Sequence, residues 1–225
     1  MKCGIVFADY TDRVDLLACK SVLLFGGSFD PPHVAHLALP LEAMKKIGAD
    51  AVAYIPAALS PFKQDQPPTE PKHRLAMLRL MLAHEDRAVI LTDELDRASA
   101  EDAKPSYTID TIAALHQRLG EGIKLRLLIG ADQLASFDKW RQWERVIELA
   151  EPVVMVRPPA TRESMLANLP EGFDVDVWRT RMVDLPVMDV SATAIRQRIA
   201  AGQSIRGMVV PAVEAYIHKH GLYRA

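Results

Sequence analysis

Two histidines follow a glycine pair and a proline pair at the start of a predicted helix. The apolar run Leu23–Phe25 leads into Gly26-Gly27, and Pro31-Pro32 precede His33 and His36. Glycines allow close approach of backbone to a ligand, and residues three apart in a helix share one face. Imidazole N–H groups beside free helix amides can donate to an anion such as a phosphate. A surface pair or a metal site with a third ligand remains an alternative, but the glycine turn favours the anion.

A second set of phosphate donors is predicted where a later helix begins. Ser191 suits an N-cap, and the amides that follow it, including that of Thr193, can hold phosphate oxygens. Arg196 lies one turn further, and its planar guanidinium can grip a phosphate through two parallel hydrogen bonds. The alternative is an ordinary capped helix with a solvated arginine.

Elements that position these residues are visible as short apolar runs alternating with segments of helical period. Nearly continuous apolar runs are typical of parallel strands buried on both faces. The expected strands are Ser21–Phe25, Ala51–Pro56, Ala88–Thr92, Lys124–Ile129, Pro152–Val156 and Met182–Val187. The expected helices are His33–Ile47, Pro71–Ala83, Thr108–Leu119, Trp140–Leu149, Ser191–Ala201 and Val213–His220.

This alternation predicts an α/β fold: a doubly wound, Rossmann-like parallel sheet with helices on both faces and a small C-terminal helical part. Ligands of such sheets bind beside the carboxyl ends of the strands, where we expect the loops Ala57–Pro68 and Arg97–Pro105. Thr69 is expected to cap the helix that begins near Pro71. Pro40 falls inside the first helix and should kink it or remove one hydrogen bond.

Composition excludes several classes of protein. The 225 residues carry 27 Lys and Arg against 29 Asp and Glu, for a net charge of −2. That balance lacks the basic excess on which non-specific nucleic-acid binding rests, so no nucleic-acid partner is expected. No apolar run approaches the roughly 20 residues that cross a bilayer, so no membrane partner is expected.

The cysteines and the N-terminal charges predict a cytoplasmic protein. Cys3 and Cys19 form no CxxC pair, which argues against a disulfide scaffold or a structural zinc site. Acidic residues occupy the stretch before Cys19 where a signal peptide needs its apolar core. We therefore expect a reducing compartment. No linker interrupts residues 21–225, which are interpreted as one domain, and residues 1–20 as an N-terminal extension of unknown role.

Several motifs together resemble a known family. The segment Gly27–His36 resembles the GxFxPxHxGH signature of a nucleotidyltransferase superfamily with a Rossmann-like fold. From about residue 21 onward, further segments resemble the bacterial nicotinate-nucleotide adenylyltransferases, in family order: Pro105–Thr108, Ile129–Leu134 with Trp140, Val156–Pro158, Val190–Arg196, and the ending Tyr216-Ile217 with Gly221–Arg224. Two departures are Ala35, where the family has glycine, and Phe62, where histidine is common.

The resemblance implies an enzyme of NAD biosynthesis that joins ATP and nicotinate mononucleotide to give deamido-NAD and pyrophosphate. His33, His36 and Arg196 would be catalytic. The ATP contacts it implies are Gly26, Gly27, Ser28, Phe29, Lys63, Gly130, Asp132, Ser191 and Thr193. The implied contacts to the nicotinate nucleotide are Tyr107, Thr108 and Trp140. Magnesium would arrive with ATP and need few protein ligands, and a homo-oligomer is compatible with the sequence.

Two other functions stay open at this point. Another adenylyl- or cytidylyltransferase of the superfamily, acting for example on phosphopantetheine, would share the first motif. A nucleotide-binding sensor could keep the fold without turnover, although the intact histidine pair and Arg196 argue against it.

Overall fold

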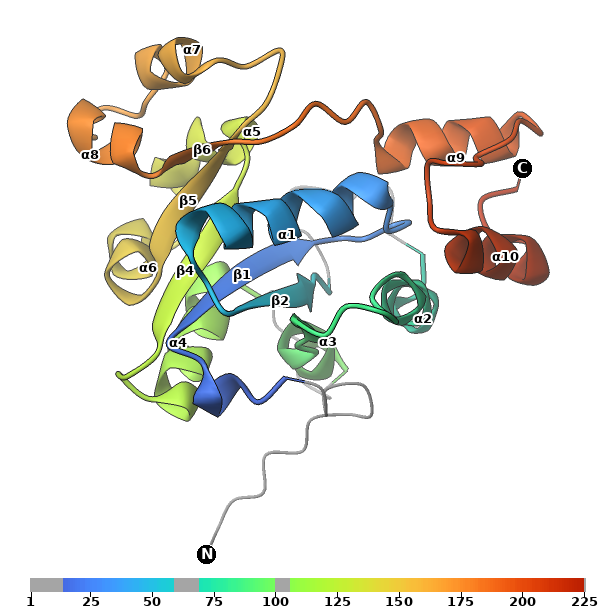
Figure 1. Ribbon diagram of the computed structural model, residues 1–225, viewed down its shortest axis with the longest axis horizontal. Helices are drawn as coiled ribbons and strands as arrows, with labels where there is room; N and C mark the ends of the chain where they lie inside the picture. The colour runs from blue at the N-terminus through green and yellow to red at the C-terminus, as the bar shows by residue number, and fades with distance from the viewer. Residues whose placement is uncertain (1–13, 59–68, 100–105, 225) are drawn as a thin grey trace, which may run out of the picture.

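The computed structural model describes residues 14–58, 69–99 and 106–224, and places six parallel strands in one sheet (Figure 1). The strand order is β3-β2-β1-β4-β5-β6. Their bounds are β1 Ser21–Gly27, β2 Ala51–Pro56, β3 Ala88–Ile90, β4 Lys124–Ile129, β5 Glu151–Val156 and β6 Met182–Asp184. The chain runs outward from β1 to one edge and then from β4 to the other. The order therefore reverses between β1 and β4, where doubly wound sheets form their binding crevice.

Helices cover both faces of this sheet. Their bounds are α1 Val34–Ile47, α2 Pro71–Met81, α3 Asp93–Ala98, α4 Thr108–Leu119, α5 Ala131–Leu134, α6 Trp143–Leu149, α7 Arg162–Ala167, α8 Val175–Thr180, α9 Ala192–Ala200 and α10 Pro211–His220. Two 3₁₀ turns, η1 and η2, span Leu16–Ala18 and Phe137–Lys139.

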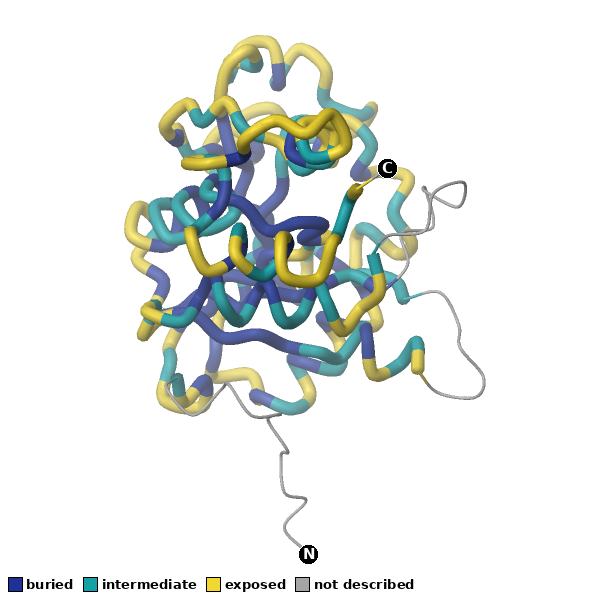
Figure 2. The backbone as a smooth tube through the Cα atoms, turned by 90° about the vertical axis from the view of Figure 1, so that its right-hand side faces the viewer, coloured by how far each residue is buried: buried dark blue, intermediate teal, exposed yellow. Residues whose placement is uncertain are grey.

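The core divides into two layers because successive side chains of a strand point to opposite faces. In β1, Leu23 and Phe25 pack with α1, α2, α9 and α10, whereas Val22 and Leu24 pack with α4 and α6. Figure 2 shows the buried strands in dark blue between more exposed helices. Both faces of the sheet are covered, which explains the continuous apolar runs. The predicted fold class, including the C-terminal helical part formed by α9 and α10, is confirmed.

Several predicted boundaries are wrong. The third and sixth strands end at Ile90 and Asp184, before the Thr92 and Val187 expected from their apolar runs. Helix α6 begins at Trp143, because the amide of Trp140 closes the preceding 3₁₀ turn by donating to the carbonyl of Phe137.

Short helices and one cap were also mispredicted. The elements α3, α5, α7 and α8 span four to six residues, too short to show a helical period in the sequence. Helix α2 takes Glu70 as its N-cap and not Thr69. The amide of Thr69 instead donates to the Asp30 carboxylate, a long-range contact that overrides the local capping preference.

None of the helices in the described ranges has both the length and the apolar character needed to cross a membrane.

Candidate active site

The two histidines lie at the carboxyl end of β1, where the strand order reverses. His33 is the N-cap of α1 and His36 lies in its first turn. Their rings stack with centroids 3.6 Å apart and planes inclined by 18°. His33 is buried and His36 half-buried. The sequence prediction that both imidazoles share one face is therefore confirmed, and they form a close pair.

Local hydrogen bonding sets which nitrogen of His36 can donate. Its Nδ1 accepts the backbone N–H of His33 at 3.3 Å. A neutral imidazole carries one proton, so that proton sits on Nε2, the atom facing away from the helix backbone. His33 Nδ1 is buried and has no hydrogen-bond partner among the described residues. The pair thus presents N–H groups without needing to be charged.

Burial keeps both rings neutral. Desolvation, followed by the positive charge of Arg157, lowers the pKa of His33 to about 4. Desolvation, with smaller contributions from His33 and Arg157, lowers the pKa of His36 well below its ordinary value. Arg157 follows β5 at the same edge of the sheet. Sequence reasoning placed it in a family motif without a role, although its position after a strand end was a usable signal.

The helix hydrogen bond that Pro40 was predicted to remove is replaced by one from a neighbouring strand. Helix α1 continues through Pro40, whose missing N–H would otherwise bond the carbonyl of His36. The hydroxyl of Tyr54 in β2, fully buried, donates to that carbonyl at 3.1 Å. Tyr54 therefore replaces the lost helix hydrogen bond and ties the second histidine to the sheet.

The turn between β1 and α1 is packed around Phe29. Phe29 has φ 49° and a fully buried ring, with the ring of His36 5.1 Å away, centroid to centroid. A Cβ on Gly27 would lie 3.2 Å from the Phe29 ring, which explains why glycine is needed there. The predicted ATP contact of Phe29 can then involve only its backbone, whereas Gly26 and Ser28 are exposed.

The family departure at Ala35 has a structural explanation. Its methyl group is buried in the core layer on the α1 side of the sheet. The substitution therefore leaves the approach to the histidines unobstructed.

Arg196 reaches the same turn from α9. Its Nη1 donates to the carbonyl of Asp30 at 2.7 Å, and its Nη2 lies 3.5 Å from the hydroxyl of Thr193. The Ser191 hydroxyl accepts the amide of Ala194, as expected of an N-cap. Arg196 is thus brought next to the histidine turn, while Ser191 and Thr193 are exposed at the start of the helix.

A fully buried arginine, which sequence reasoning missed, donates hydrogen bonds to the backbone of this turn and of neighbouring segments. The guanidinium of Arg74 donates to the carbonyls of Ser28 at 2.7 Å, Thr69 at 2.9 Å and Ala58 at 3.4 Å. Desolvation lowers its pKa, and the nearby Asp30 carboxylate opposes that shift. Arg74 lies on the apolar stripe of α2 with Met77, and a charged residue on such a stripe was the available signal.

The remaining predicted residues lie around this edge of the sheet. Gly130 caps α5 directly after β4, and Asp132 is exposed in its first turn. Thr108 begins α4 and is not its N-cap, which is Tyr107. Because α4 returns the chain to the start of β4, Thr108 lies at the carboxyl edge of the sheet.

Trp140 and Tyr107 are brought into one region. The guanidinium of Arg141, next to Trp140, stacks 4.7 Å from the centroid of the Tyr107 ring. Trp140 itself packs against Phe137 and is half-buried, with part of its surface accessible. The predicted contact Lys63 lies outside the described residues.

The described part of the chain holds no group of three or more histidine, cysteine or acidic residues that could bind a metal ion. Both carboxylate oxygens of Asp30, the acidic residue of the turn, already accept hydrogen bonds from Tyr223 and Thr69. The described residues of this turn are therefore hydrogen-bond donors suited to phosphates and do not form a magnesium cage.

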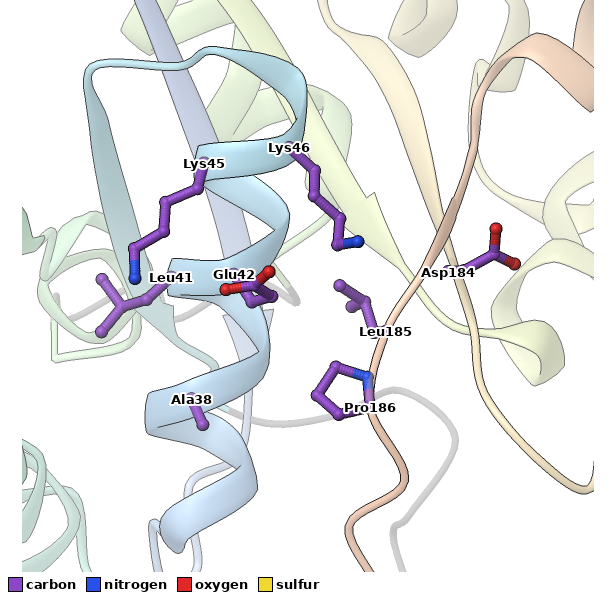
Figure 3. Close-up of a pocket in the computed structure, with 8 residues that line it drawn as sticks. All are labelled: Ala38, Leu41, Glu42, Lys45, Lys46, Asp184, Leu185 and Pro186. Atoms are coloured by element: carbon purple, nitrogen blue, oxygen red, sulfur yellow. The ribbon is translucent and has the colours of Figure 1, made fainter.

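A hollow of about 540 Å³ lies elsewhere, between α1 and the segment after β6 (Figure 3). Lys45, Lys46 and Glu42 line one side, and Asp184 and Leu185 the other. It contains neither histidine nor Arg196, and we assign it no role in phosphate binding.

Comparison with known proteins agrees with this geometry. Residues 24–198 match the model of the cytidylyltransferase-like family. A probable nicotinate-nucleotide adenylyltransferase of Roseiflexus sp. strain RS-1 is 40% identical over 201 residues, covering 89% of this chain and 96% of the relative. Its counterpart from Chromobacterium violaceum is 35% identical over 219 residues, covering 89% and 97%.

A solved structure shares the fold. The nicotinic acid mononucleotide adenylyltransferase of Plasmodium falciparum, complexed with NaAD, superposes with a TM-score of 0.65 at 19% identity, covering 91% of this chain and 97% of that one. Doubly wound parallel sheets bind their ligands where the strand order reverses, and the histidine pair lies at that point. The chain belongs to the cytidylyltransferase-like family. Its similarity to the nicotinate-nucleotide adenylyltransferases, expected from the motifs, is confirmed by these relatives.

Proposed function

We propose that the chain transfers the adenylyl group of ATP to nicotinate mononucleotide, giving deamido-NAD and pyrophosphate. The observation that carries this proposal is the stacked, neutral pair His33 and His36 at the switch point of the sheet, with Arg196 beside it. The choice of substrates is supported by the relatives that match nearly the whole chain.

The proposed reaction asks for positioning and charge stabilisation. The 5′-phosphate of the mononucleotide attacks the α-phosphorus of ATP, and the bond from that phosphorus to the bridging oxygen breaks as pyrophosphate leaves. The attacking phosphate is already an anion, so no activated serine or cysteine is required. In this proposal the Nε2–H of His36 and the N–H of His33 donate to oxygens around the transferred phosphorus, where negative charge grows.

Other predicted residues take the roles that their positions support. Arg196 would contact the pyrophosphate portion together with the exposed start of α9 at Ser191 and Thr193, and Lys63 would approach the phosphates from its loop. The adenosine would lie near Gly130 and Asp132, and the nicotinate ring near Tyr107, Thr108 and Trp140. Magnesium would be carried on the phosphates of ATP, because the described residues offer no ligand set of their own.

The test is pyrophosphate release from ATP with each of three acceptors: nicotinate mononucleotide, nicotinamide mononucleotide and phosphopantetheine. We expect the nicotinate acceptor to give the highest kcat/KM. His36→Ala should lose at least about 100-fold in kcat, because one preorganised donor to a developing charge contributes roughly 3 kcal/mol. The matched control is His84→Ala, since His84 is exposed and precedes β3 at the opposite edge of the sheet.

Distinct outcomes identify the alternatives. Turnover confined to phosphopantetheine would favour a different transferase of the superfamily, and binding of ATP without turnover of any acceptor would favour a sensor. Near-normal turnover by a folded His36→Ala protein would remove His36 from the mechanism.

A further inference from the structure

The C-terminal segment returns to the turn that carries the histidines. After α10 the chain passes through Gly221, and the hydroxyl of Tyr223 donates to Oδ1 of Asp30 at 2.6 Å, across 193 positions of sequence. In Figure 1, α9 and α10 lie on the side of the molecule toward which β1 points. The Gly221–Arg224 motif contributed to the family resemblance but received no role in the reaction.

Asp30 connects its own turn to three other segments of the chain. Its Oδ1 accepts from Tyr223, its Oδ2 accepts the amide of Thr69 at 3.1 Å, and its carbonyl accepts from Arg196 at 2.7 Å. The residue is 7% exposed. A buried carboxylate requires such donors, because each offsets part of the cost of removing its charge from water. The side chain of Asp30 is therefore held in place by Tyr223, which follows α10, and by Thr69, which precedes α2.

The backbone on both sides of this contact is conformationally demanding. Phe29, which precedes Asp30, has φ 49°, and Tyr223 has φ 63°. Residues with a side chain occupy this left-handed region only where the surrounding structure holds them there. Burial, then the hydrogen bond to Asp30, raises the pKa of Tyr223, so its hydroxyl keeps its proton and remains a donor.

We infer that Tyr223 is a positioning residue for the transfer reaction: through Asp30 it fixes the turn that aims His33 and His36. The inference rests on the proposed function, because it assigns the histidines to the reacting phosphate. Asp30 lies three residues before His33, and the ring of Phe29 packs against His36. A displacement of this turn thus reaches both imidazoles, and a misplacement of about 1 Å can cost roughly 100-fold in rate.

The chain supplies a matched control in Tyr216. Its hydroxyl lies 3.0 Å from Nδ1 of His73, and its ring contacts His220. Tyr216→Phe and Tyr223→Phe each remove one tyrosine hydroxyl from the C-terminal part, but only Tyr223 contacts Asp30. The pair therefore separates a general weakening of the C-terminal part from a displacement of the histidine turn.

Steady-state kinetics of the two variants is the first arm of the test. We expect Tyr223→Phe to lower kcat by about tenfold while KM for ATP and for nicotinate mononucleotide changes by less than about twofold, because geometry is lost at the reacting centre more than in ground-state binding. Tyr216→Phe should keep kcat within about twofold of the wild type. An unchanged kcat in Tyr223→Phe, or an equal loss in both variants, would overturn the inference.

The second arm uses the histidine ring signals in NMR spectra of the ligand-free protein and needs no substrate. Tyr223→Phe should shift the ring signals of His33 and His36, and Tyr216→Phe those of His73 and His220. Unshifted His33 and His36 signals in Tyr223→Phe would refute the positioning role even in an active enzyme. If Tyr223→Phe shifts the ring signals of His33 and His36 as expected but the wild-type protein turns over no acceptor, the proposed function is refuted. The catalytic part of this inference is then refuted with it.

Discussion

The stacking of the two imidazole rings disfavours protonation of His33 and His36 when no anion is bound. With ring centroids 3.6 Å apart, two imidazolium ions would repel each other, and Arg157 adds a third positive charge. A bound triphosphate brings negative charge and reverses this balance. Without such an anion, the preference of the pair for the neutral form lowers the stability of the folded protein in acid.

Stability should therefore fall in mild acid because of His33. Its pKa is about 4 in the folded protein against an ordinary value of 6.5. Below pH 6.5 the unfolded chain takes up a proton that the folded protein does not, so the loss grows as pH falls and is complete below about pH 4, at roughly 3 kcal/mol. Between about pH 7 and pH 5, the free energy of unfolding of His33→Asn should fall by about 2 kcal/mol less than that of the wild type. Urea unfolding at the two pH values measures this difference.

The control for this comparison is His84→Asn, which makes the same substitution at an exposed histidine outside the site. All three proteins carry the same carboxylates, so the comparison isolates the effect of the substituted histidine. Equal losses in wild type and His33→Asn would show that His33 titrates normally.

At the scale of elements, periodicity predicted the strands and long helices, and long-range contacts decided the rest. The apolar runs located β2 and β4 to the residue, and β2 is buried along its whole length while β4 is fully buried from Leu127 to Ile129. The histidine pair was also predictable, because the two histidines and the glycines before them lie within one short segment of the sequence. No local sequence pattern indicates that Tyr223 contacts Asp30 or that Tyr54 contacts the carbonyl of His36. Such hydrogen bonds depend on how the elements pack.

The contact between β2 and α1 gives a prediction that links these elements. Tyr54→Phe leaves the carbonyl of His36 without the donor that replaces the missing N–H of Pro40. We expect the free energy of unfolding to fall by about 1–3 kcal/mol, the cost of an unpaired buried acceptor. Pro40→Ala restores a backbone N–H at that position, so Tyr54→Phe should be markedly less harmful in a Pro40→Ala background.

Urea unfolding of the four proteins of this double-mutant cycle is the measurement. Equal losses in the two backgrounds would mean that the tyrosine acts by packing and not by replacing the helix hydrogen bond.

At the scale of the whole molecule, the start of the described chain is continuous with the core. Leu16 in η1 is 1% exposed and packs in the layer that contains α4. The carboxylate of Asp15 accepts the amide of Leu17, and the carboxylate of Asp50 accepts the amides of Lys20 and Ser21. Through these contacts, residues 14–20 pack and hydrogen-bond with the rest of the folded domain.

Two truncations distinguish the parts of this N-terminal segment. Removing residues 1–18 deletes Leu16 and should lower the free energy of unfolding by about 2–4 kcal/mol, similar to Leu16→Ala, because either change empties a core site. Removing residues 1–13 leaves Leu16 and the Asp15 cap in place, so the difference between the two truncated proteins reports on residues 14–18. The mass in solution, measured on the same samples, shows whether either deletion changes assembly. If the longer deletion melts with the wild type, the core does not depend on η1, and the segment is an appendage whose purpose lies outside folding.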